Sequence, residues 1–128
     1  MTSLWIQDLV EERKGGHSLA RDFYTHPEIF ALDIEKIYRR NWLYAGPTCK
    51  IPKPGDYFVY EIGDESIIVI RAKDGTVNAL ANVCRHRGSL ICSEKSGHVK
   101  SLVCPYHAWA YDLDGKLVSA ARMSCEFD

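Results

Sequence analysis

The interpretation of this chain depends on two short segments, Cys84-Arg85-His86 and Cys104-Pro105-Tyr106-His107. Each segment places one cysteine and one histidine in a tight loop, and residues 87–103 separate the two. Two such loops that face each other can hold a [2Fe–2S] cluster, with both cysteines on one iron and both histidines on the other. Gly88 has no Cβ and would let the backbone pass close to an inorganic core, and Pro105 would stiffen the second loop. The spacing therefore predicts an iron–sulfur site.

Two other interpretations of the same four residues remain open. Zinc also binds two thiolates and two imidazoles, in a tetrahedron, and structural zinc sites usually separate paired cysteines by about two to four residues. The pair Cys84 and His86 has a single residue between its members, which is unusual for zinc. The third interpretation is that the four residues share no role. The spacing favours the iron–sulfur site over both alternatives.

The composition is that of an ordinary soluble globular protein. The chain has 128 residues, enough for one domain with a core or for a domain with a short appendage. Its residues are 46% hydrophobic and 26% charged, and the net charge is −1. This balance gives no sign of a nucleic-acid or membrane partner. We find no apolar run that could span a bilayer and no signal-peptide pattern at the N-terminus.

The cysteine content favours a reducing compartment. The chain has five cysteines, of which Cys84 and Cys104 belong to the predicted cluster site. We expect Cys49, Cys92 and Cys125 to be reduced and mostly buried, because free cysteine behaves as a small apolar residue. Disulfides are rare in the cytosol, so we expect a cytoplasmic protein.

Residues 27–41 are predicted to form a helix, after a surface lead-in over residues 1–24. Thr25 and Glu28 have the spacing of a capping box, and Pro27 suits the first turn of a helix. Apolar residues recur on one face of this helix, as in an amphipathic helix: Phe30, Ile34, Ile37 and Tyr38.

Beyond residue 42 the sequence changes to short β-runs that turn residues interrupt. Seven strands are expected, over residues 42–45, 56–62, 66–72, 76–83, 100–103, 108–111 and 116–119. The run 66–72 is nearly all isoleucine and valine, as in a strand buried on both faces. Many short strands with frequent turns predict a mainly β, antiparallel sandwich or barrel. Both ligand pairs fall in connections at strand ends, close to one tip of this assembly.

Several further segments resemble the N-terminal Rieske domain of the α-subunits of Rieske non-haem iron oxygenases. The resemblance covers residues 21–128 and is carried by four segments: residues 39–46, 52–58, 82–88 and 104–112. It is closest to oxygenases that act on quaternary-ammonium compounds such as betaines. It implies a Rieske-type antiparallel sandwich or barrel over residues 43–128, with cluster-binding loops at one tip. Residues 1–42 would then be a lead-in and a helix.

The resemblance also implies a function. Rieske domains of this family accept one electron at a time from an NAD(P)H-dependent reductase or a ferredoxin. They pass each electron to a mononuclear iron in a separate C-terminal domain, usually of a neighbouring α-subunit, where O2 is activated. The resulting mono- or dioxygenase would hydroxylate or demethylate a small organic substrate. Cys84 and Cys104 would bind one iron of the [2Fe–2S] cluster, and His86 and His107 the other.

This chain lacks the pattern for the second iron. Its other histidines, His17, His26 and His98, have no neighbouring histidine and acidic residue of the kind that a facial triad uses. We therefore expect no catalytic residue and no mononuclear iron, and an electron-carrying fragment of a homo-oligomeric oxygenase. The apolar helix face, left without a catalytic domain, would fold onto the sheets or self-associate. A stand-alone Rieske-type ferredoxin is the alternative, although the long segment 1–42 weighs against it.

For the residues around the expected ligands, the sequence supports less specific predictions. Arg85 and Arg87 would dock an acidic ferredoxin or bind a carboxylate, or they would be solvated loop charges. We expect Tyr106 and Trp109 to pack against the site and shield it. Ser89 could donate a hydrogen bond to a cluster sulfur. Ser89 and Tyr106 also occupy the places of two disulfide-forming cysteines in respiratory Rieske proteins, so that bridge is absent. We expect His98 to be an exposed loop residue.

Overall fold

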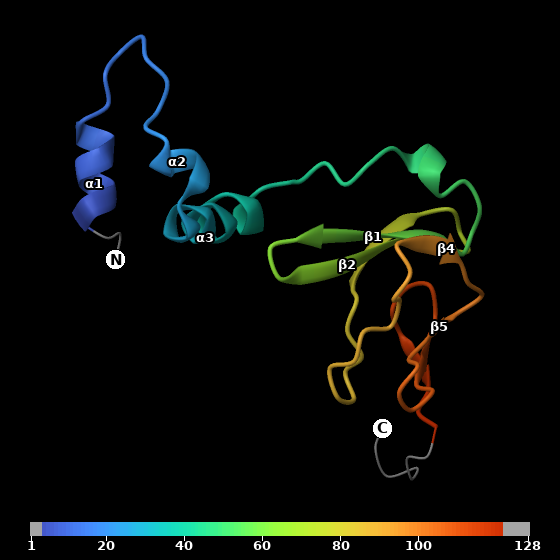
Figure 1. The fold of residues 1–128 in the computed structure, drawn as a ribbon. Coiled ribbons are helices and arrows are strands. Elements are labelled where there is room, and N and C mark those ends of the chain that lie inside the picture. The colour runs from blue at the N-terminus through green and yellow to red at the C-terminus, as the bar shows by residue number, and fades with distance from the viewer. Residues whose placement is uncertain (1–3, 122–128) are drawn as a thin grey trace. The chain divides into compact units, whose positions relative to one another are not determined.

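The computed structural model describes residues 4–121 of the chain. The chain divides into two compact units, with the boundary between Tyr44 and Ala45. The first unit contains the helices α1 (Leu4–Glu11), α2 (Asp22–Thr25) and α3 (Pro27–Lys36) and the 3-10 helix η1 (Tyr38–Arg40). The second unit contains the 3-10 helix η2 (Thr48–Lys50) and seven strands (Figure 1). Within residues 4–121, no helix has the length and apolar character needed to cross a membrane.

Helix α3 begins at Pro27, as predicted, but its N-cap is His26 and not Thr25. Thr25 is the last residue of α2, and the His26 Nδ1 accepts a hydrogen bond from the backbone N–H of Glu28 at 3.3 Å. The indole N–H of Trp5 donates to the Glu28 carboxylate at 3.1 Å, and the Trp5 ring lies 4.4 Å from the His26 ring. The predicted capping box is absent, because Thr25 belongs to the last turn of α2 and does not cap α3.

The predicted helix over residues 27–41 is shorter than expected, and another residue is buried. Helix α3 ends at Lys36, and the chain then tightens into η1. The buried residue of α3 is Ile29, at 6% exposure, whereas Phe30 and Ile37 of the predicted apolar face are 56% and 52% exposed. That this exposed face packs against another surface stays a prediction.

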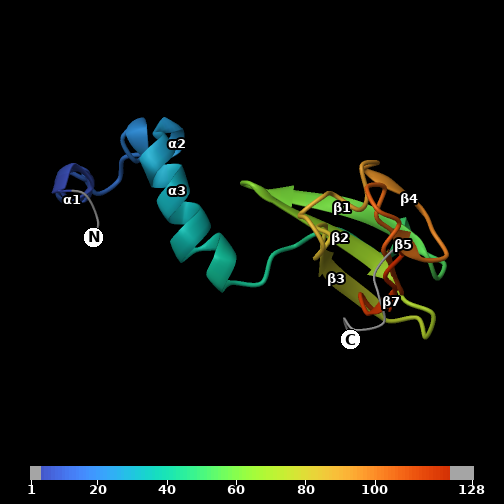
Figure 2. The same cartoon turned by 90° about the horizontal axis from the view of Figure 1, so that it is seen from below.

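The larger sheet of the second unit has four antiparallel strands in the order β3-β2-β1-β4. Figure 2 shows β1, β2 and β3 side by side. A tight turn at Gly63-Asp64 joins β1 to β2 and pairs Ile62 with Glu65, with Gly63 at a φ of 58°. The strand bounds are Asp56–Ile62 for β1, Glu65–Arg71 for β2, Val77–Ala81 for β3 and Ser96–His98 for β4.

The smaller sheet has three antiparallel strands in the order β5-β6-β7. These are Leu102–Val103, Ala110–Tyr111 and Leu117–Ser119. One apolar core is built from residues of both sheets: it includes Ile68 and Ile70 of β2 and Leu102 of β5, each at most 2% exposed. Val69 is also buried, so β2 is covered on both faces, as its sequence predicted. The mainly β, antiparallel class predicted from the sequence, a sandwich or barrel, is thus confirmed.

One predicted strand is absent, and one strand of the structure was not predicted. Residues 42–45 form no strand, and Trp42 is fully exposed. An extended segment becomes a strand only when a neighbour completes its backbone hydrogen bonds, and none of the described residues does so here. Conversely, β4 was missed because its sequence, Ser96-Gly97-His98, has no apolar alternation. It pairs with residues 56–58 of β1.

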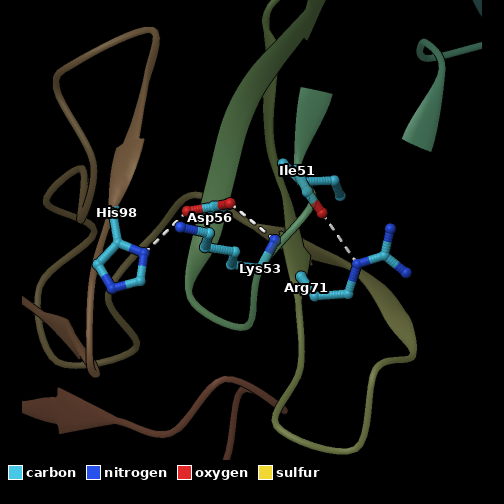
Figure 3. A network of polar contacts seen from close by, with 5 residues as sticks. All are labelled: Ile51, Lys53, Asp56, Arg71 and His98. Atoms are coloured by element: carbon cyan, nitrogen blue, oxygen red, sulfur yellow. Dashed lines mark hydrogen bonds and ion pairs between the residues drawn. The ribbon is translucent and has the colours of Figure 1, made fainter. Parts of the chain in front are cut away.

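Polar contacts fix the start of β1 (Figure 3). The Asp56 carboxylate accepts one hydrogen bond from the backbone N–H of Lys53 and another from His98 Nδ1, both at 2.8 Å. The side chain of Arg71 donates from Nε to the carbonyl of Ile51 at 2.9 Å. These contacts tie the segment before β1, and the first residue of β1, to the two strands that flank β1, which are β2 and β4.

Candidate functional site

The two cysteine–histidine segments lie in two loops of the second unit. The first loop follows β3, and the second connects β5 to β6. Although the segments are separated in sequence, the loops are adjacent. The centroids of the His86 and His107 rings are 4.7 Å apart. The structure therefore brings the two loops together, with His86 beside His107.

The first loop closes through two backbone hydrogen bonds around Cys84. Its N–H donates to the carbonyl of Ser89 at 2.8 Å, and its carbonyl accepts from the N–H of Gly88 at 2.9 Å. Gly88 has a φ of 68°, in the left-handed region that glycine adopts without strain. Glycine is therefore favoured at this position of the turn.

The second loop repeats this arrangement around Cys104. Its N–H donates to the carbonyl of Trp109 at 2.8 Å, and its carbonyl accepts from the N–H of Ala108 at 3.0 Å. Ala108 has a φ of 57° and is the only non-glycine residue with positive φ in the described part of the chain. The two loops thus have the same backbone frame, although their histidines stand two and three residues after the cysteine.

The two thiols are buried at the base of the loops. Cys84 and Cys104 are each 2% exposed and belong to the apolar core. The phenol of Tyr111 lies 3.3 Å from Sγ of Cys84. Burial opposes ionisation of Cys84, but hydrogen bonds from Tyr111, from the backbone of His86 and from Cys104 outweigh it, so the pKa of the Cys84 thiol is lowered. A thiolate is the form that binds a metal.

Aromatic rings surround the two imidazoles. The Trp109 ring is stacked on His86, with centroids 4.7 Å apart and planes 5° apart. The Tyr106 ring lies 3.8 Å from the His107 ring and is 59% exposed on the whole. Trp109 therefore covers one imidazole from the protein side, and Tyr106 contacts the other from the surface, as the sequence predicted for packing and shielding.

The donor set fits a [2Fe–2S] group. The His86 Nδ1 is buried and has no hydrogen-bond partner among residues 4–121, and the His107 Nδ1 is buried as well. A buried ring nitrogen without a partner is costly unless another group binds it. Within the described residues, no three metal-binding side chains converge as on a single ion. The thiols form one pair and the imidazoles another, which is the division of ligands in a mixed cysteine–histidine cluster.

The other residues singled out from the sequence have mixed outcomes. Arg85 and Arg87 are exposed. The Ser89 hydroxyl donates to the Leu90 carbonyl at 3.4 Å, so a bond from this hydroxyl to a sulfur stays a prediction. His98 is exposed, as predicted, but lies in β4 instead of a loop.

The remaining cysteines were predicted correctly only in part. Cys92 is a buried thiol, and burial raises its pKa. Cys49 is also a free thiol but is exposed, contrary to the prediction, because it lies in the short surface helix η2. Cys125 lies outside the described residues.

Sequence reasoning missed three residues that shape the site: Tyr111, Asn82 and Ala108. Tyr111 was assigned only to a strand, and its contact with Cys84 depends on how the second sheet packs. Asn82 directly precedes the first loop, and a polar residue at the end of an apolar strand was the available signal. The left-handed turn at Ala108 has no signal of its own, but Gly88 at the same place in the first loop could have indicated it.

Comparisons with known proteins agree with this geometry. Residues 41–126 match the family described as the Rieske [2Fe-2S] domain. The chain is 48% identical over 122 residues to the glycine betaine monooxygenase oxygenase subunit of Chromohalobacter salexigens, covering 94% of this chain and 27% of the relative. It is 43% identical to the protein of the same description from Pseudomonas aeruginosa, covering 94% and 28%. The chain thus spans little more than a quarter of the length of these relatives.

Solved structures give the same result. A crystal structure of the quaternary ammonium Rieske monooxygenase CntA with L-carnitine has a TM-score of 0.76 and 34% identity, covering 84% of this chain and 31% of that one. Naphthalene 1,2-dioxygenase from Rhodococcus sp. bound to indole has a TM-score of 0.80 and 29% identity, covering 91% and 27%. On the family match, the sequence identity and the shared fold, the chain belongs to the Rieske [2Fe-2S] domain family.

Proposed function

We propose that this chain is the electron-transfer domain of an oxygenase α-subunit, and that four side chains hold its cluster. Cys84 and Cys104 would bind one iron as thiolates. His86 and His107 would bind the other through Nδ1, the nitrogen that is buried in both rings. The observation that carries the proposal is the pairing of two buried thiols and two neighbouring imidazoles on equivalent adjacent loops.

The chain's own residues tune and protect this site. Two neutral imidazoles in place of two thiolates reduce the negative charge, and Rieske potentials accordingly lie at about −150 to +300 mV. When bound, the cluster supplies reversible one-electron transfer. Tyr111 contributes a hydrogen bond to Cys84, and Trp109 keeps water from one face of His86.

We infer that the complete enzyme acts on a quaternary-ammonium compound. This rests on the relatives, which include glycine betaine monooxygenase oxygenase subunits, and on the likeness to CntA, whose solved complexes contain L-carnitine and gamma-butyrobetaine. O2-dependent hydroxylation or demethylation would take place at a mononuclear iron outside this chain. Aromatic dioxygenase α-subunits are also relatives, so an aromatic hydrocarbon is the competing substrate class.

The partners would be an NAD(P)H-dependent reductase or ferredoxin, and the catalytic domain of the same or a neighbouring α-subunit in a homo-oligomer. The exposed Arg85 and Arg87 flank His86 and would attract an acidic redox partner. The described cysteines are thiols, which supports a cytoplasmic location.

The ligand assignment is tested on the protein reconstituted with iron and sulfide without oxygen. The reduced wild-type protein should give a Rieske-type EPR signal, and Cys84→Ser and His107→Ala should each abolish it. Cys49→Ser and His98→Ala are matched controls and should retain the signal, because neither residue lies in the ligand loops. A colourless protein that binds one zinc ion instead would refute the proposal.

The substrate class is tested with the complete α-subunit and its reductase. Consumption of O2 that depends on glycine betaine or carnitine, with a hydroxylated or N-demethylated product in the mass spectrum, would support the quaternary-ammonium assignment. Turnover of naphthalene or biphenyl with no turnover of glycine betaine or carnitine would contradict it.

A further inference from the structure

We propose that Asn82 is a positioning residue that closes the base of the first ligand loop and so holds Cys84 and His86 ready for the cluster. This inference rests on the proposed ligands. Asn82 is 2% exposed and is the only buried polar residue among the core positions of the described chain. It takes no part in metal binding in the proposal above.

Every polar atom of the Asn82 amide is used. Its Oδ1 accepts hydrogen bonds from the backbone N–H groups of Ile91 at 3.1 Å and Cys92 at 2.8 Å. Its Nδ2 donates to the carbonyl of Cys92 at 2.8 Å and to the hydroxyl of Ser66 at 3.1 Å. Three of the four bonds therefore join the residue before the loop to the backbone after it.

The second ligand loop needs no such side chain. Its base is closed by strands β5 and β6, where Leu102 pairs with Tyr111 and Val103 with Ala110. The first loop begins after the end of β3 at Ala81, and residues 91–92 belong to no strand. The Asn82 amide therefore does for the first loop what a backbone ladder does for the second.

Asparagine suits this role because its amide carries both a donor and an acceptor, like a peptide group. The backbone N–H of Asn82 also donates to the carbonyl of Ser66 at 2.8 Å, which anchors it to β2. The first ligand loop is thus held at three successive levels. Asn82 closes its base, the hydrogen bond from the Cys84 N–H to the Ser89 carbonyl closes its middle, and the bond from the Gly88 N–H to the Cys84 carbonyl closes its tip. Removal of the amide would leave the Cys92 N–H and carbonyl buried without partners.

The test compares the rate at which reconstituted protein loses its cluster to a chelator, followed by the visible absorbance. Asn82→Ala should lose the cluster about 10–100-fold faster than wild type, because the buried N–H and carbonyl of Cys92 left without partners favour opening of the first loop. Asn82→Ser, which keeps a short hydroxyl, is a milder change. Its rate of cluster loss should lie between those of the wild type and Asn82→Ala.

Two matched variants separate positioning from general stability. Asn78→Ala removes a β3 amide that binds the Leu113 carbonyl and the Asp114 carboxylate, outside the first loop. Ser66→Ala removes the one hydrogen bond of the Asn82 side chain that does not reach residues 91–92. Both should keep cluster loss within about twofold of wild type, even where they lower the melting temperature. Equal rates for Asn82→Ala and Asn78→Ala at similar melting temperatures would overturn the proposal.

Amide hydrogen exchange gives a measurement on the wild-type protein itself, which does not depend on any variant folding. The N–H groups of Ile91 and Cys92 should exchange as slowly as those of β2, and Asn82→Ser should speed both selectively. Fast exchange of both groups in the wild-type protein would overturn the inference. A wild-type protein without a Rieske-type signal would instead refute the ligand assignment, so the two failures are distinguishable.

Discussion

The phenol of Tyr111 lies 3.3 Å from Sγ of Cys84 and 3.2 Å from the backbone N–H of Arg85. The amide N–H can only donate, so the phenolic oxygen accepts from Arg85 and its hydrogen is left for the sulfur. Burial, followed by the contact with Cys84, raises the pKa of Tyr111 above 10.0, which keeps the phenol protonated. Tyr111 is therefore a hydrogen-bond donor to a proposed ligand.

Tyr111→Phe should lower the reduction potential of the cluster. A hydrogen bond to the ligand sulfur stabilises the more negative reduced state. With a net worth of about 0.5–1.5 kcal/mol for one hydrogen bond, the loss corresponds to roughly 20–60 mV. Protein-film voltammetry measures the shift, with Tyr106→Phe as the exposed control. An unchanged potential in Tyr111→Phe would show that the phenol does not donate to Cys84.

The equivalent turns at Gly88 and Ala108 predict opposite effects of reciprocal substitutions. Both residues have positive φ, 68° and 57°, and the left-handed conformation costs an L-residue about 1–2 kcal/mol. Ala108→Gly should therefore stabilise the protein by up to about 1 kcal/mol, after the entropy that glycine loses on folding. Gly88→Ala should destabilise it by about 1–2 kcal/mol. Denaturant unfolding measures both, and effects of equal sign would contradict the shared loop geometry.

Gly55 should tolerate substitution less well than Gly75. Both have a φ near +90°, but a Cβ on Gly55 would overlap the carbonyl oxygen of Val99, whereas nothing lies within 4 Å of a Cβ on Gly75. Gly75→Ala should cost about 1–2 kcal/mol for the backbone alone. Gly55→Ala should cost about 1–3 kcal/mol more, because β1 and the Val99 segment must separate. Equal free energies of unfolding for the two variants would mean that this contact relaxes freely.

The Asp56 carboxyl should titrate below its ordinary pKa of 3.8. The hydrogen bond from His98, followed by that from the Lys53 backbone, lowers the pKa of Asp56. The folded protein therefore binds this proton less readily than the unfolded chain. The resulting stability is present above pH 3.8 and is lost as the pH falls through the lower folded-state pKa. The contribution to the free energy of unfolding is small, because solvent screens the interaction between Asp56 and His98.

Carbon-13 NMR of the Asp56 carboxyl gives its pKa directly. His98→Ala should raise this pKa only part of the way to 3.8, because the bond from the Lys53 backbone remains. A pKa that His98→Ala leaves unchanged would show that the two side chains do not interact in solution.

The local features of the second unit were predictable from the sequence. The turn at Gly63-Asp64 and the isoleucine-rich strand β2 both formed where alternation and turn chemistry placed them. The same holds for the start of α3 at Pro27. The two tight loops that carry Cys84, His86, Cys104 and His107 were predicted as well, because such turns depend on a few consecutive residues; that these four residues bind a cluster stays a prediction.

Contacts between distant segments could not be predicted in this way. Strand β4 exists only because residues 56–58 offer it a paired edge, and residues 42–45 form no strand because they lack one. Tyr111 reaches Cys84 only after the two sheets pack together, and Asn82 reaches Cys92 only after the first loop closes.

Spacing in the sequence thus determined which four residues could bind a cluster, because ligand type and local turn geometry are properties of a few consecutive residues. Tertiary structure decided how those four side chains are buried, hydrogen-bonded and held. The physical reason is that burial and long-range hydrogen bonds depend on which segments the shared core of the two sheets brings into contact.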